Sequence, residues 1–190
     1  MKENTRQKLI DVTFEEVFSN GYQGASLKEI LEKAKVHKGS MYHYFKSKKE
    51  MALVAIEEKI SNRNSKRYED ILKLESGFID AFFDSLKDTT QRDFNRGCPI
   101  ANVIQEMSNI DVDFNNMMNK IYTQFRLYIK RILDKAIQTN EIKACDTQKI
   151  ALFIASTLEG AILSAKASGE IIDYLHTIEI LENYIDTLRV

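Results

Sequence analysis

Apolar residues recur at helical spacing along the whole chain, with polar residues between them. Near the N-terminus this pattern predicts a helix from about Thr5 to Asn20, and Gly21 suits the left-handed position that ends many helices. The chain has no run of alternating polar and apolar residues of the kind that strands show. Its single proline, Pro99, is the one residue of this type that could interrupt a helix. We therefore expect an all-α fold.

Beyond about residue 75 the pattern predicts five further helices. Their expected ranges are about Phe78–Leu86, Pro99–Ser108, Asp113–Thr139, Thr147–Ala167 and Ile171–Leu188. No apolar run approaches the length needed to span a bilayer, and the N-terminal segment lacks the apolar core of a signal peptide. We therefore expect a cytoplasmic protein with no membrane partner.

The segment from Ser26 to Met51 predicts short helices separated by tight turns. Ser26 followed by Glu29 forms a capping box, in which the hydroxyl accepts a free backbone N–H and the glutamate reaches back. The same pattern recurs at Ser47 and Glu50, where a fourth helix is expected to begin. Between the two caps, residues 37–45 predict a basic helix of barely two turns. Two helices that meet at a short turn, the second small and basic, are typical of a helix-turn-helix DNA reader.

The charge of the chain changes this picture through its distribution. A formal net charge of -1 over 190 residues argues against a generally polybasic or disordered chain. Between residues 28 and 49, however, two glutamates face seven lysines, namely Lys28, Lys33, Lys35, Lys38, Lys46, Lys48 and Lys49. Local basic charge of this kind neutralises phosphates, so the DNA-reading interpretation gains support.

The same segment resembles the DNA-binding domain of the tetracycline-repressor (TetR) family of bacterial regulators. The matching residues are Ser26, Ile30, Ala34, Val36, Gly39, Tyr42, Tyr44, Phe45, Lys48 and Met51, preceded by Ile10, Thr13, Phe18, Gly21 and Tyr22. The match is close over about the first third of the chain, and a plain helical hairpin is the alternative. The resemblance implies a helix-turn-helix DNA-binding domain at 1–50 and a helical ligand-binding and dimerisation domain at 51–190. Lys35 departs from the usual glycine of the turn, and His37 from the usual serine or threonine cap.

Candidate DNA contacts follow from the shape of a major-groove reader. Small or hydrogen-bonding side chains should face the bases, which selects Lys38, Gly39, Ser40 and His43. Phosphate contacts are expected from Tyr42, Tyr44, Lys48 and the capping residue Ser26. The aromatic residues could instead belong to the core, above all Phe45, and Ser26 could be a cap only. Lys46 and Lys49 are expected to be solvated charges. His37 and His43 lack the neighbouring ligands that a metal site needs.

Residues 96–102 resemble a segment that opens a helix beside the ligand cavity in some TetR subgroups. A helix N-terminus and Arg96 both favour the thiolate form of Cys98, which could sense electrophiles or oxidants. The alternative is a small buried residue. Further candidates for a mixed polar and apolar ligand pocket are Asn102, Glu106, Tyr122, Phe125 and Tyr128. Aromatic residues at helical spacing could equally form ordinary core.

The resemblance also implies a homodimer formed through the last two helices. A two-fold dimer presents two reading heads to a palindromic operator in double-stranded DNA. We therefore expect a transcriptional repressor that a small molecule or a thiol-reactive effector releases from its operator. The alternative is a helical ligand-binding or scaffold protein without DNA binding. No cofactor or enzyme activity is expected, because the sequence has no Gly-rich phosphate loop, metal constellation or recognisable Cys–His pair.

Overall fold

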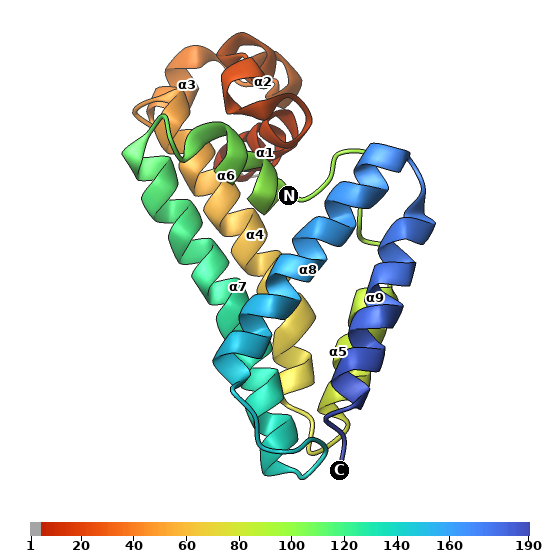
Figure 1. The fold of residues 1–190 in the computed structure, drawn as a ribbon. Coiled ribbons are helices and arrows are strands. Elements are labelled where there is room, and N and C mark those ends of the chain that lie inside the picture. Colours follow the sequence, from red (N-terminus) through yellow and green to blue (C-terminus); the bar gives the residue numbers. More distant parts are fainter. Residues whose placement is uncertain (1–4) are drawn as a thin grey trace. The chain divides into compact units, whose positions relative to one another are not determined.

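The computed structural model describes residues 5–190, and over this range the all-α prediction is confirmed. Figure 1 shows the helices in chain order. They are α1 (Thr5–Gly24), α2 (Leu27–Ala34), α3 (Lys38–Tyr42), α4 (Lys48–Leu72), α5 (Phe78–Lys87), α6 (Pro99–Met107), α7 (Val112–Gln138), α8 (Thr147–Ser168) and α9 (Ile171–Asp186). The five helices expected beyond residue 75 are all present, within about two residues of their predicted ends.

The chain divides into two compact units. The first contains the residues up to Asn62 together with Pro99–Ile121, and the second contains Arg63–Cys98 and Tyr122–Val190. The long helices α4 and α7 each supply residues to both units. Compactness therefore groups α6 and the start of α7 with the N-terminal helices, whereas the division into functional domains at residue 50 stays a prediction.

The first unit is built around short helices with well-defined ends. Gly21 has φ 74° and ψ 165°, so the regular part of α1 stops at Asn20, as predicted. The third helix is shorter than the predicted range 37–45 and covers only Lys38–Tyr42. His37 occupies its N-cap position without a side-chain hydrogen bond, so nothing extends the helix at that end.

The turn between α2 and α3 is left-handed at Lys35, where the family usually has glycine. Lys35 has φ 53° and ψ 43°, and its backbone N–H donates to the carbonyl oxygens of Glu32 and Leu31. For a residue with a Cβ this backbone conformation costs about 1–2 kcal/mol in steric strain. The substitution by lysine therefore leaves the turn in place and strains it.

Lys35→Gly is expected to stabilise the protein by about 1 kcal/mol, because glycine adopts positive φ without this steric cost. Thermal unfolding should show a melting temperature raised by about 2–4 °C. Asn140→Gly is the matched control, since Asn140 also has positive φ (59°) and asparagine tolerates it well. A lower melting temperature for Lys35→Gly would contradict the strain argument.

The second unit has an aromatic core between α5 and α9. The apolar face of α5 is fully buried, as the spacing of its residues predicts: Phe78, Ile79, Phe82, Phe83 and Leu86. Tyr174 of α9 is also buried and donates its hydroxyl to the backbone oxygen of Leu86 at 2.9 Å. Helix α8 packs along α9, and the two are joined at Gly169, which closes α8 in a left-handed conformation.

Helix α8 corrects one expectation from the sequence. Among the described residues it is the one helix that is long and apolar enough to cross a membrane by length and composition, so the statement that no such run exists was wrong. Core helices of soluble proteins pass the same test, and 44% of the apolar window is buried inside the protein. The helix also carries the half-buried Glu159 in its middle. These features make α8 weak evidence for a membrane segment.

Candidate DNA-binding surface and effector region

Two caps fix the ends of the helices around the predicted reading helix. The Ser26 hydroxyl accepts the backbone N–H of Glu29 at 3.5 Å and begins α2. The Ser47 hydroxyl accepts the N–H of Glu50 at 3.1 Å, while the Glu50 carboxylate accepts the N–H of Lys46 at 2.6 Å. In the second pair the glutamate reaches back, as the sequence predicted, but it accepts the N–H of the residue before the cap and not that of Ser47 itself. In the first, only the serine half is formed.

Helix α3 presents polar and aromatic side chains outward while two apolar side chains anchor it. Met41 and Phe45 are buried, at 0% and 3% exposure, so the interpretation of Phe45 as a core residue is confirmed. Tyr42 and Tyr44 are 50% and 46% exposed, which resolves the question of whether they belong to the core. The other outward residues are Lys38, Gly39 and His43, which are exposed, and Ser26 and Ser40, which are half-buried.

The two lysines at the start of α4 differ from the exposed candidates. The Lys48 ammonium donates to the backbone oxygen of Tyr22 at 2.6 Å and lies 4.3 Å from the centroid of the Tyr22 ring. Burial lowers the pKa of Lys48. Lys49 was expected to be solvated, but it pairs with Asp111 at 2.7 Å and Asp113 at 2.6 Å. Both lysines thus tie α4 to other parts of the first unit.

Glu106 of α6 holds the end of the first helix. Its carboxylate accepts the backbone N–H groups of Tyr22 at 2.8 Å and of Gln23 at 2.9 Å. A Cβ on Gly21 would lie 2.8 Å from the same carboxylate, so the backbone approaches Glu106 as closely as glycine allows. Glu106 was predicted to line a ligand pocket, and here both carboxylate oxygens are already used within the first unit.

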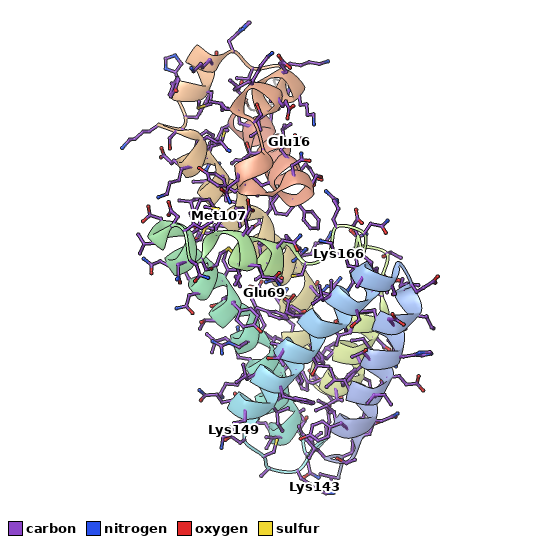
Figure 2. The ribbon with its side chains drawn as sticks, turned by 45° about the horizontal axis from the view of Figure 1, so that its top comes forward. Glu16, Glu69, Met107, Lys143, Lys149 and Lys166 are labelled. Carbon is purple, nitrogen blue, oxygen red and sulfur yellow. The ribbon has the colours of Figure 1, made fainter. Side chains whose placement is uncertain are left out.

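Cys98 directly precedes α6 and is buried, with 8% exposure. Its thiol donates to Glu159 of α8 at 3.2 Å. Burial raises the pKa of the Glu159 carboxyl, while the contact with Cys98 acts in the opposite direction. Lys166 of α8, labelled in Figure 2, donates to the backbone oxygen of Arg96, two residues before Cys98, at 3.2 Å.

The aromatic candidates of α7 surround a tyrosine that the sequence analysis did not select. Phe125 and Tyr128 are buried, and their ring centroids lie 6.1 and 5.7 Å from that of Tyr68 in α4. Tyr122 is half-buried, with its ring centroid 6.2 Å from that of Phe125. Tyr128 also donates its hydroxyl to Glu69 at 3.3 Å, and Glu69 is labelled on α4 in Figure 2. These residues form one cluster in the second unit.

Comparison with protein families decides the identity of the fold. Residues 9–55 match the model for bacterial regulatory proteins of the tetR family, and residues 77–181 match a tetracyclin repressor-like C-terminal domain. The chain belongs to the TetR family. It is therefore a DNA-binding transcriptional regulator of the helix-turn-helix type, and the first match contains all eight predicted DNA-contacting residues.

Several relatives of this TetR regulator are similar over most of its length. An uncharacterized HTH-type transcriptional regulator of Lactococcus lactis subsp. lactis is 24% identical over 98% of this chain and 92% of its own. The transcriptional regulator AcuR of Cereibacter sphaeroides is 28% identical over 84% of this chain and 75% of its own. The transcriptional repressor NemR of Escherichia coli is 26% identical over 62% of this chain and 61% of its own. The crystal structure of reduced NemR superposes with a TM-score of 0.86 at 22% identity, covering 95% of this chain and 96% of that one, which shows a shared fold.

The structure of this TetR regulator thus places all predicted DNA contacts in the first unit, whereas the predicted ligand residues belong to both units. Asn102 and Glu106 belong to the first unit, whereas Cys98 and the α7 aromatic residues belong to the second. Sequence reasoning missed Tyr68 and Glu159, since a tyrosine or a glutamate at helical spacing carries no signal of its own. Among residues 5–190 no group of three metal-ligating side chains occurs.

Proposed function

We propose that this TetR-family protein is a homodimeric repressor that binds a palindromic operator and leaves it when an effector binds or modifies the protein. The observation that carries the proposal is the row of exposed side chains on and after α3, where Tyr42, His43 and Tyr44 lie between the buried anchors Met41 and Phe45. Exposed aromatic side chains that lie next to one another are typical of surfaces that contact a partner.

The contacts to DNA divide into two kinds. Lys38, Gly39, Ser40 and His43 are proposed to face base edges in the major groove. Tyr42, Tyr44 and Ser26 are proposed to contact phosphates, which orient the protein without reading sequence. Lys48 keeps this proposed role only through donors beyond the one it gives to Tyr22, because its ammonium is partly withdrawn from solvent.

The dimer is proposed to form through α8 and α9. Apolar side chains on these helices remain exposed in the single chain, among them Phe153 (48%), Leu163 (58%), Ile180 (68%) and Tyr184 (44%). A surface hollow lies among them, lined by Phe153, Thr157, His176, Thr177, Ile180, Leu181 and Tyr184. An apolar, hollowed face on adjacent helices suits a second copy of the same face related by two-fold symmetry. Its two heads would then meet two half-sites of a palindrome.

The repressor sense is supported by the relative NemR, which is named a transcriptional repressor. An enzymatic role has no support in the family, whose members are regulatory proteins. We place the protein in the cytoplasm, where such regulators meet DNA.

The effector is proposed to act on the second unit and to reach the head through α6. Candidate contacts there are Cys98, Tyr122, Phe125 and Tyr128, whereas the other two candidates, Asn102 and Glu106, lie on α6 in the first unit. Cys98 is joined to the first residue of α6, and Glu106 of the same helix holds the amides that follow Gly21. A change at Cys98 that shifts α6 would therefore weaken the hydrogen bonds between Glu106 and the amides of the head.

Alkylation of Cys98 is expected to weaken operator binding by on the order of tenfold, the usual size of coupling between two sites. N-ethylmaleimide would form a bond between the thiol sulfur and a ring carbon, with the thiol proton passing to the neighbouring carbon. Cys98→Ser should abolish the response. Cys145→Ser should keep it, because Cys145 lies just before α8 and is not joined to α6. Unchanged operator affinity after complete modification of Cys98 would end the sensor proposal.

Selection of binding sites from random duplex DNA at moderate salt tests the whole proposal. Enrichment of a palindrome is the expected result, and it would provide the operator for the other experiments. Recovery of unrelated sequences would leave a nonspecific binder. Recovery of nothing would favour the alternative of a helical ligand-binding or scaffold protein.

A further inference from the structure

Three arginines gather in the second unit. Arg63 and Arg67 are one helical turn apart on α4, so their side chains share a face. Arg92 lies in the loop between α5 and α6, and its guanidinium carbon is 5.1 Å from the centroid of the buried Tyr174 ring. Burial, followed by the charge of Arg92, lowers the pKa of Arg67, and Arg63 adds to this effect. Arg67 therefore lies within electrostatic reach of both other arginines.

The protein supplies little negative charge to this cluster. Among the described residues none of the three arginines forms an ion pair with a carboxylate. Burial raises the pKa of the neighbouring Tyr68 hydroxyl, and the charge of Arg67 acts in the opposite direction. Two carboxyl groups lie within electrostatic reach. Asp88 is exposed and accepts the N–H and hydroxyl of Thr90, while Glu159 has its pKa raised by burial.

Two polar atoms in this region are buried without any partner. They are the Nε of Arg92 and the Oε2 of Glu159. A buried donor on a cation costs several kcal/mol unless a partner completes it. Because cations in proteins are otherwise paired when buried, this arrangement has the charge and the free donors of a site that awaits an anion.

We propose that the second unit binds a small organic anion, whose carboxylate or phosphate group is held by Arg67 and Arg92, with the exposed Arg63 one helical turn from Arg67. The guanidinium fork matches two oxygens of such a group. The apolar part of the molecule would lie against aromatic side chains beside the arginines, which include Phe94 and Tyr174, with ring centroids 4.9 Å apart. This inference rests on the proposed function, because the anion would be the effector of that regulator.

Thermal unfolding of the full chain with matched acid and neutral probes tests the inference. The pairs are benzoate with benzamide, hexanoate with hexanamide, and phenyl phosphate with phenol, each at 10 mM and at constant ionic strength. At least one anionic probe is expected to raise the melting temperature by about 3 °C or more, while its neutral partner does not. The arms separate a carboxylate site from a phosphate site.

Variants separate a binding role from a structural one. Arg67→Met should lose the shift and, without probe, should melt at the same temperature as the wild type or higher, because an uncompensated buried charge is gone. Arg131→Met, which removes an exposed arginine of α7, should keep the shift. Glu159→Gln should enlarge it, since it removes a carboxyl group near the arginines. If the arginines were purely structural, Arg67→Met and Glu159→Gln would not change the probe-induced shift of the melting temperature in opposite directions.

The outcomes that overturn the inference are distinct from failure of the proposed function. Equal shifts by acids and neutral partners, no shift by any probe, or strong destabilisation by Arg67→Met would each overturn the anion site. Binding of the probe-free protein to its selected operator is measured separately. Loss of that binding would refute the regulator proposal and leave the anion result standing.

Discussion

Replacing Tyr42 and His43 together by alanine is expected to lower operator affinity by on the order of 10²–10⁴-fold. Each lost phosphate or base contact is worth about 1–3 kcal/mol, and the two residues are exposed neighbours at the end of α3. Because neither side chain is part of the core, the fold should survive the change. Binding isotherms on the selected operator measure the effect, at one fixed salt concentration.

The control for this experiment is Lys143→Ala, which removes an exposed cation in the second unit (Figure 2). It should bind the operator as the wild type does. The double variant should also keep the melting temperature and the dimer, measured by thermal unfolding and size-exclusion chromatography. Operator affinity within a few-fold of wild type would show that α3 is not the reading helix.

Local signals predicted the helices of the head well. The capping serines Ser26 and Ser47 begin helices where the sequence places them, since a hydroxyl cap depends only on residues within one turn. The left-handed turn at Lys35 was harder to predict, because the usual glycine is absent. The turn keeps its conformation although lysine is strained there. Helix α3 starts one residue later and ends three residues earlier than predicted.

Contacts between distant segments could not be predicted from local patterns. Lys49 finds Asp111 and Asp113 more than sixty residues away, so its assignment as a solvated charge was wrong. The gathering of Arg67 and Arg92 likewise depends on how α4 meets the loop before α6. In the sequence alone, each of these arginines looks like an ordinary surface cation. Only the fold reveals that they lack carboxylate partners.

Gly21→Ala is expected to destabilise the protein by about 2–5 kcal/mol, which lowers the melting temperature by roughly 4–20 °C. Two costs combine. Alanine at φ 74° is strained by about 1–2 kcal/mol, and its Cβ would meet the Glu106 carboxylate at 2.8 Å. If Glu106 moves away, the N–H groups of Tyr22 and Gln23 lose a charged acceptor, which costs a further 1–3 kcal/mol or so.

Gly77→Ala separates these two costs, because Gly77 also has positive φ (76°) but a Cβ there would meet no atom within 4 Å. It should therefore lose only the strain energy. Glu106→Ala should destabilise the wild type more than it destabilises Gly21→Ala, since the second protein has already lost part of the contact. If the losses of stability from Gly21→Ala and Glu106→Ala were additive, the new Cβ would not disturb the contact with Glu106.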